Sequence, residues 1–224
     1  MGEYSVGVAT RNKIYSVAKR LFYEQGVEAT TYAQICDGAE VNRGLIPYYF
    51  KGKPNIAIAV FNDFLDGIEK AIDQQWHPGE LIDPERNIIY ELLEFRLFTH
   101  DKNALRFYSE ILGDRRYQDA TLGTQEEVMR QLAAGSGVEI TPAEMRTITS
   151  MVNGTESELV KALERDYLQE SVEDFVRRDM LCCFFLLGSD IEQASRWCDS
   201  AFQKAAGLTL ACTVDFNTSV VRDS

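Results

Sequence analysis

Apolar side chains recur every three or four residues over most of this chain, which is the spacing of one face of an α-helix. The first stretch of this kind contains Ile14, Val17, Ala18, Leu21 and Phe22. Thr10 is placed to cap a helix there and Gly26 to end it in the left-handed conformation. The pattern therefore predicts a helix over about residues 10–25.

Caps and prolines mark the boundaries of the later helices in the same way. Two short helices are expected over about residues 32–39 and 42–49, with Thr31 and Asn42 as their caps. A helix from the Gly52-Lys53-Pro54 turn to about residue 75 follows, and residues 76–80 break the pattern as a hinge. Further helices are expected at about residues 83–99, 103–112, 117–134, 142–168 and 171–188, and after a capping box at residues 189–192. The tail from Thr209 is expected to be loosely held, so the fold class is all-α with about nine or ten helices.

The charge of the chain is unevenly divided along its length. The whole chain carries a net charge of −12, which taken alone argues against a nucleic-acid partner because phosphate repels an anionic protein. Residues 1–56, however, hold seven basic and five acidic side chains, a net of +2, and the remainder carries −14. We therefore expect two domains, residues 1–56 and residues 57–224, connected by the helix 53–75.

Composition narrows the remaining choices. The longest apolar run, residues 180–187, is far shorter than the roughly 20 residues that span a bilayer, and residues 1–10 do not resemble a signal peptide. The five cysteines, without CxxC spacing, indicate reduced and buried thiols in a cytoplasmic protein. With only two histidines, His77 and His100, a multi-histidine metal site is not expected, and no cofactor is implied.

The first 50 residues have the order of a helix-turn-helix: a long helix, then two short helices joined by a tight turn. In such a unit the second short helix enters the major groove of DNA while the first supports it. Apolar positions that would face the domain core are present at Ile35, Ala39, Val41, Ile46 and Phe50. The outward positions of the recognition helix are Arg43, Gly44, Leu45, Pro47, Tyr48 and Tyr49.

These residues resemble the DNA-binding domain of the TetR family of bacterial transcriptional regulators over about a quarter of the chain. The matching pieces are Thr10–Ile14, Leu21-Phe22 with Gly26, Ala29-Thr30-Thr31 with Ile35, and the stretch VNRGLIPYYF at 41–50 followed by Lys53. The resemblance implies a ligand-responsive regulator, a repressor released from double-stranded operator DNA by a small-molecule effector, acting as a homodimer. It implies no membrane association and no enzymatic activity.

The resemblance also implies a role for each matching position. Thr31 and Tyr32 would hold a phosphate at a helix N-terminus, and Arg43 would reach phosphate or guanine. Gly44 would allow close approach to the base edges, Tyr48 and Tyr49 would offer hydroxyls to the DNA backbone, and Lys53 would supply a charge. At the remaining positions of the recognition helix, Leu45 and Pro47, we expect contact with thymine methyl groups and readout of DNA shape.

Three positions depart from the family pattern, and two of them, Leu45 and Pro47, stand where the family often has a hydrogen-bonding side chain. Glu40 stands where glycine is favoured in the turn, so either the turn is shifted or Glu40 adopts an unusual backbone conformation. Pro47 removes a backbone amide within a short helix, so either it falls in the first turn, where this is tolerated, or the helix starts late.

The C-terminal three quarters is expected to hold the effector and to form the dimer. Each of the helices 142–168 and 171–188 carries an apolar stripe that would pair two subunits. The stripe of helix 142–168 comprises Met145, Ile148, Val152, Leu159 and Leu163. The stripe of helix 171–188 comprises Val172, Phe175, Val176, Met180 and Phe184. The effector pocket is expected between helix 53–75 and the helices of residues 83–135. Its expected lining is Phe95, Phe98, Phe107, Tyr108, Leu112 and Met129.

Two other functions remain open at this point. One is an interaction or small-molecule-binding protein with a degenerate helix-turn-helix, for which Glu40 and Pro47 would be symptoms. The other is an all-α enzyme with His100 and neighbouring carboxylates as acid and base.

Overall fold

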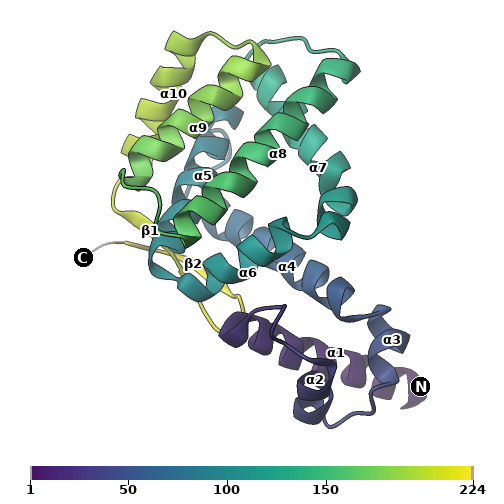
Figure 1. Cartoon of the computed structure of the whole chain (residues 1–224). Helices are drawn as coiled ribbons and strands as arrows, with labels where there is room; N and C mark the ends of the chain where they lie inside the picture. The colour runs from purple at the N-terminus through teal and green to yellow at the C-terminus, as the bar shows by residue number, and fades with distance from the viewer. Residues whose placement is uncertain (1, 223–224) are drawn as a thin grey trace.

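The chain forms ten helices and one antiparallel pair of strands within the residues that the structure, a computed structural model, describes, 2–222 (Figure 1). The helical prediction is confirmed. The helices are α1 (Gly2–Gln25), α2 (Tyr32–Ala39), α3 (Leu45–Phe50), α4 (Lys53–Asp73), α5 (Asp83–His100), α6 (Lys102–Leu112), α7 (Arg115–Gly135), α8 (Pro142–Glu164), α9 (Val172–Leu187) and α10 (Ile191–Lys204). The strands are β1 (Leu208–Cys212) and β2 (Thr218–Arg222).

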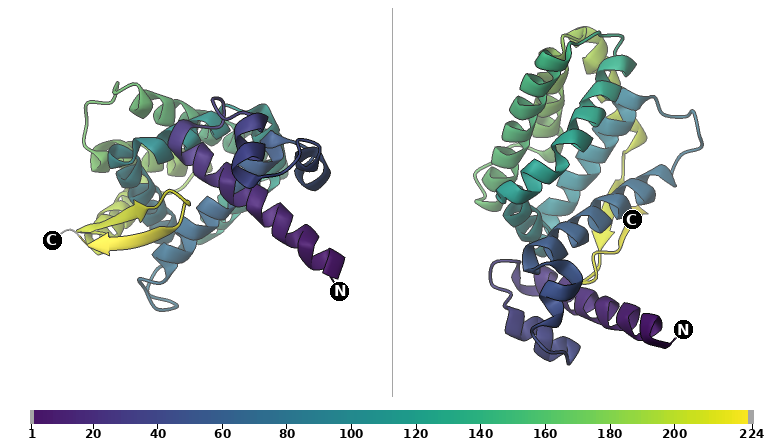
Figure 2. Two further views of the ribbon diagram at one scale, coloured as in Figure 1. Left: turned by 90° about the horizontal axis from the view of Figure 1, so that it is seen from below. Right: turned by 90° about the vertical axis from the view of Figure 1, so that its right-hand side faces the viewer.

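Helices α1 to α3 form one end of the molecule and α5 to α10 the other, with α4 between them (Figures 1 and 2). Helix α4 contacts α1 and α3 on one side and α5 and α6 on the other. Its apolar stripe is continuous along the helix and includes Ile56, Val60, Phe61, Phe64 and Ile68, all fully buried. One apolar core therefore joins the two ends of the molecule through α4.

Helix α1 is longer than predicted. It includes Thr10, which lies inside the helix and not at its N-terminus. No proline interrupts residues 2–13, so the helix continues upstream of the expected cap. The predicted C-terminus is correct, because Gly26 takes a left-handed φ of 86° and its amide closes the last turn on the carbonyl of Phe22.

The tail beyond Thr209 is well anchored, so the expectation that it is loosely held was wrong. Strands β1 and β2 pair in antiparallel register from Leu208 opposite Arg222 to Cys212 opposite Thr218. The turn between them buries Phe216 among the rings of Phe64 and Phe107, with ring centroids 5.2 and 4.4 Å apart. The hairpin lies against α4 and α5, as both views of Figure 2 show.

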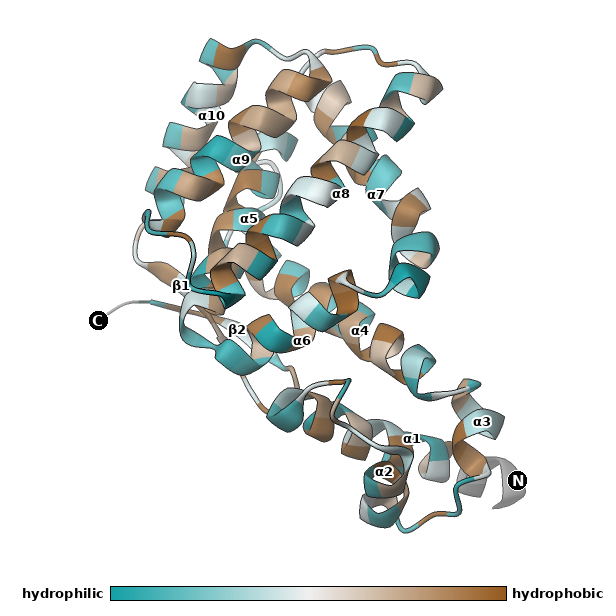
Figure 3. Ribbon diagram, in the orientation of Figure 1, coloured by the Kyte–Doolittle hydropathy of each residue, from teal (hydrophilic) through white to brown (hydrophobic). Residues whose placement is uncertain are grey.

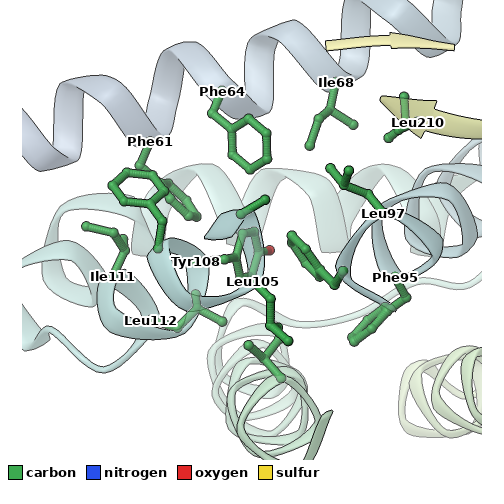
Figure 4. Packing of buried hydrophobic residues seen from close by; sticks show 14 of the residues in the cluster. Phe61, Phe64, Ile68, Phe95, Leu97, Leu105, Tyr108, Ile111, Leu112 and Leu210 are labelled. Carbon is green, nitrogen blue, oxygen red and sulfur yellow. The ribbon is translucent and has the colours of Figure 1, made fainter. Parts of the chain in front are cut away.

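Aromatic side chains dominate the centre of the larger helical region (Figure 4). The ring of Phe61 lies 5.0 Å from that of Tyr108 and 4.5 Å from that of Tyr117. These contacts fix α4, α6 and α7 relative to one another. In Figure 3 brown, hydrophobic residues and teal, polar ones alternate along the ribbons of these helices.

Candidate nucleic-acid interface and ligand cavity

The turn between α2 and α3 is built on a non-glycine residue in a left-handed conformation. Glu40 ends α2 with φ 53° and ψ 47°, and its amide bonds to the carbonyls of Asp37 and Cys36. Its carboxylate lies 2.5 Å from the ammonium of Lys13 on α1, which lowers the pKa of Glu40. Of the two alternatives raised by the sequence, the turn is therefore unshifted and Glu40 adopts the unusual backbone itself.

The recognition helix α3 begins three residues later than predicted. Asn42 lies in the preceding turn, where its carbonyl accepts a hydrogen bond from the amide of Leu45, and Gly44 is the residue before the helix. Pro47 is therefore the third residue of α3. Because the first amides of a helix have no partner within it, the missing amide of Pro47 breaks no helical hydrogen bond.

The outward face of α3 is open to solvent. Arg43, Gly44, Pro47 and Tyr48 are exposed, and Tyr48 has 77% of its surface accessible. The Tyr48 ring packs edge-on against that of Tyr49, which is half-buried, with centroids 4.9 Å apart. A Cβ at Gly44 would meet no atom of the protein within 4 Å, so the space beside this glycine is free for a partner.

The inward face of α3 anchors the helix in the core. Ile46 and Phe50 are buried, and the Phe50 ring stacks on Tyr15 of α1 at 6.3 Å. The guanidinium of Arg11 also lies over the Phe50 ring, 4.8 Å from its centroid. The apolar positions expected from the sequence thus hold α3 against α1 and leave its polar face free.

Thr31 and Tyr32 lie at the exposed N-terminus of α2, as predicted. The Thr31 hydroxyl accepts a hydrogen bond from the amide of Gln34, and the Gln34 side chain accepts one in return from the Thr31 amide, at 3.2 and 2.8 Å. The Tyr32 hydroxyl accepts the amide of Lys53 at 2.9 Å. This contact joins the start of α2 to the start of α4 and leaves the proton of the Tyr32 hydroxyl available to a partner.

The ammonium of Lys53 is engaged within the protein. It donates to the carbonyls of Val27 and Thr30 at 2.6 and 2.5 Å, and burial lowers its pKa. The amide of Val27 in turn donates to the carboxylate of Glu110 on α6 at 2.5 Å. The loop between α1 and α2 is therefore held by α4 and α6 together, and the structure gives Lys53 a positioning role in it.

A cavity of about 640 Å³ lies among helices α4 to α9. Three of the six expected residues, Tyr108, Leu112 and Met129, line it. The other three, Phe95, Phe98 and Phe107, are buried in the core and do not. Their rings pack on one another and on neighbouring aromatic rings, which fill the space that a ligand would need.

The polar part of the cavity is acidic, a property that the sequence analysis missed. Its acidic lining residues are Asp66, Glu69, Glu91, Glu94, Glu156 and Asp179. Burial raises the pKa of Glu94, and burial together with the nearby Glu156 raises that of Asp179 to about 7. The sequence did carry a signal of this acidic lining, because Glu91 and Glu94 interrupt the apolar run of Leu92, Leu93 and Phe95.

Helices α8 and α9 pack against each other, and the stripes expected to pair two subunits are largely used inside the subunit. Met145, Leu163, Phe175 and Phe184, for example, are buried within one chain. The physical reason is that α8 and α9 must also cover α5, α6 and α7. The large apolar side chains that remain exposed on these two helices include Met151 and Phe185, which have 51% and 69% of their surface accessible.

Other chemistry suggested by the sequence is placed as follows. His100 lies outside the cavity, with its Nε2 3.1 Å from the carbonyl of Leu210. Cys36, Cys183 and Cys198 are buried, whereas Cys182 is exposed, contrary to expectation. Within residues 2–222 no three His, Cys, Asp or Glu side chains are grouped as metal ligands. Across the same residues, no helix combines the length and hydropathy of a membrane span.

The chain thus carries a helix-turn-helix on an all-α body with a cavity among helices α4 to α9. Residues 14–60 match the model of the family described as bacterial regulatory proteins, tetR family. The N-terminal end of the chain is thus similar to the DNA-binding part of this family.

Two curated relatives match the same end of the chain. The chain is 35% identical over 66 residues to a probable HTH-type transcriptional regulator, YttP, of Bacillus subtilis, covering 30% of this chain and 32% of that one. It is 42% identical over 74 residues to the HTH-type transcriptional regulator HbdR of Aromatoleum sp., covering 31% and 32%. Each match thus spans about a third of the length of the relative.

Solved structures show the same fold over most of the chain. RolR in complex with resorcinol superposes with a TM-score of 0.64 at 17% identity, over 87% of this chain and 95% of RolR. TylP, a tetr regulator from Streptomyces fradiae, gives a TM-score of 0.53 at 19% identity, over 87% and 98%. At these identities the likeness concerns the fold.

Proposed function

We propose that this protein is a transcriptional regulator that binds operator DNA through residues 1–56 and a small-molecule effector through residues 57–224. The observation that carries the proposal is the exposed face of α3, held rigidly by its buried side within a domain that matches the tetR family. Its site of action is the cytoplasm, where bacterial DNA lies. It acts as a repressor, released from DNA when the effector binds.

Arg43 and Tyr48 carry the largest share of DNA contact in this proposal, because both are exposed on the open side of α3. Gly44 leaves room for the base edges, and Leu45 and Pro47 offer apolar contact to thymine methyl groups. The hydroxyls of Tyr32 and Tyr49 donate to backbone phosphates beside the N-terminus of α2, where Thr31 lies. Lys53 acts by positioning the loop between α1 and α2.

Fluorescence anisotropy with DNA from the region upstream of its own gene tests the proposal. Arg43→Ala should weaken binding by about tenfold or more and reduce the slope of log affinity against log salt by about one. Arg196→Ala, which removes an exposed arginine on α10 at the far end of the molecule, is the matched control and should change neither. Binding that is insensitive to salt and to Arg43→Ala contradicts the proposal.

A homodimer follows from the need to present two copies of α3 to one duplex, about 34 Å apart or somewhat more. The exposed Phe185 and Met151 supply apolar surface on α9 and α8 for the contact between subunits. Phe185→Asp should shift the protein to the monomer in sedimentation velocity, whereas Val214→Asp, in the turn of the hairpin, should not. A dimer unaffected by Phe185→Asp places the interface elsewhere.

The cavity is the proposed effector site. RolR, which has the same fold, is known in complex with the ligand resorcinol, and the cavity here has the volume of sites that hold small molecules. An effector that prefers one spacing of the two recognition helices shifts the population toward a state that no longer fits the DNA.

The two alternatives receive less support from the geometry. Glu40 and Pro47 are both accommodated without disturbing α2 or α3, so neither indicates a degenerate helix-turn-helix. The enzyme alternative assigned His100 and neighbouring carboxylates as acid and base, and His100 does not reach the cavity.

A further inference from the structure

The charges that line the cavity are almost all of one sign. Six acidic side chains line it and one basic side chain, Arg86. The guanidinium of Arg86 is already paired, at 2.8 Å with Asp73 and at 2.6 Å with Glu69. The carboxyl groups deeper in the cavity, on α5, α8 and α9, therefore have no cation of the protein among the lining residues to neutralise them.

Glu94 is the most enclosed of these groups. Only 2% of its surface is exposed, and its Oε1 has no hydrogen-bond partner among the described residues. Its Oε2 lies 3.3 Å from the hydroxyl of Tyr108, which donates its proton to Glu156 at 2.6 Å. A buried carboxyl oxygen left without a partner destabilises the folded protein, so the folded protein gains stability if a ligand completes this site.

The second unpartnered oxygen belongs to Glu91, one helical turn from Glu94 on α5, where both side chains line the cavity. Asp179 on α9 and Glu156 on α8 face the same space. Four carboxyl groups from three helices thus converge on one region, and two of them, Glu91 and Glu94, each have one oxygen without a hydrogen-bond partner among the described residues.

The rest of the lining is aromatic and aliphatic. The rings of Tyr90, Tyr108 and Tyr117 border the acidic region, and a cation beside such rings gains further attraction. Aliphatic side chains and methionines complete the wall, among them Leu65, Leu112, Val128, Met129, Leu132, Val152 and Met180. The lining is therefore suited to a molecule with a positive charge at one end and an apolar body at the other.

We propose that the cavity binds an organic cation with an apolar body, its charge placed against Glu94, Glu91, Glu156 and Asp179. This inference rests on the proposed role of the cavity as the effector site and names the chemical class of the effector. An anionic ligand would add repulsion to groups that already repel one another, and a neutral hydrocarbon would leave Glu91 and Glu94 without partners.

Three probes of nearly the same shape and different charge test the inference by isothermal titration calorimetry on the full chain. They are N-methyl-4-phenylpyridinium, its uncharged carbon isostere 4-methylbiphenyl, and the anion biphenyl-4-carboxylate. The cation should bind at least about tenfold more tightly than the neutral isostere, and the anion more weakly than either. Equal affinity of cation and isostere, or tighter binding of the anion, overturns the inference. This comparison needs no variant.

Variants then locate the charge. Glu94→Gln keeps the shape of the side chain and should lower the affinity for the cation by about tenfold while leaving the affinity for 4-methylbiphenyl unchanged. Glu192→Gln, at an exposed acidic residue on α10, is the matched control and should leave all three affinities as they are. Cation binding that is unaffected by Glu94→Gln contradicts the placement. Because no DNA is present, these results stand apart from the anisotropy measurements, so failure of either proposal is recognised separately.

Discussion

Asp179 gives a prediction whose size follows from the geometry of the cavity. This carboxyl group has its pKa raised to about 7 from an ordinary value of 3.8, because burial and the facing Glu156 both disfavour its ionised form. The pKa of Glu91 on α5 is also raised, by burial and by the nearby Asp179. Replacement by asparagine keeps the shape and removes the charge, so Asp179→Asn is expected to stabilise the protein.

The direction of the pH dependence follows from the raised pKa. An acid with a higher pKa in the folded state contributes stability that is fully present below the unfolded pKa and is lost as the pH rises through the folded pKa. For Asp179 this window runs from about pH 4 to about pH 7. A difference of about three units between the unfolded and folded pKa, at 1.36 kcal/mol per unit, limits the loss of folding free energy to about 4 kcal/mol. Partial access to solvent and rearrangement of the carboxyl groups reduce the expected value to about 2 kcal/mol.

Urea unfolding of wild type and Asp179→Asn at several pH values measures this difference. The variant should equal wild type near pH 4 and exceed it by about 2 kcal/mol above about pH 7. Asp119→Asn, at an exposed aspartate on α7, is the control and should stay within about 0.5 kcal/mol of wild type throughout. A variant no more stable than wild type at about pH 8, or a difference that does not change with pH, would refute the reasoning.

Three further predictions concern folding free energies measured by urea unfolding at about pH 8. Glu110→Ala removes the acceptor of the Val27 and Glu28 amides and should cost about 2 kcal/mol; an unchanged midpoint would show that these bonds add nothing. Phe216→Ala empties a site between three aromatic rings and should cost about 3–5 kcal/mol, and a loss below about 1 kcal/mol would mean that the hairpin does not seal the core. Pro47→Ala should change stability by less than about 1 kcal/mol, since no helical bond is missing at this position; a larger gain would show strain there.

The sequence predicted the helices well where their ends are marked chemically. The start of α8 was predicted at residue 142, and there Pro142 begins the helix while Thr141 forms a capping box with Glu144. The helix starts were less accurate where a competing cap lies nearby, as at α10, where Asp190 and not Ser189 is the cap. Local hydrogen bonds at a helix terminus are encoded by adjacent residues, so they can be recognised in one sequence.

Features that depend on contacts between distant residues could not be predicted in the same way. The hairpin is stabilised by Phe216 inserting between α4 and α6, and its two strands have only five residues each, too few for a clear pattern in the sequence. The acidic lining assembles from α5, α8 and α9, and nothing in the sequence of one helix shows that Glu156 faces Glu94. Lys53 matched the family pattern, yet only the fold shows that two carbonyls occupy its ammonium.

The position of the hairpin has a consequence for the order in which the chain folds during synthesis. Phe216 packs edge-on against Tyr23 of α1 with ring centroids 5.4 Å apart, so residues made early and residues made late share one contact. Helices α1 to α3 can form while the ribosome is still translating, but the surface that seats α1 on the rest of the molecule is complete only after residues 208–222 have emerged. A nascent chain that stops before that point carries α3 on a domain that lacks the contact between Tyr23 of α1 and Phe216. Chains cut short are therefore expected to bind DNA less firmly than finished ones.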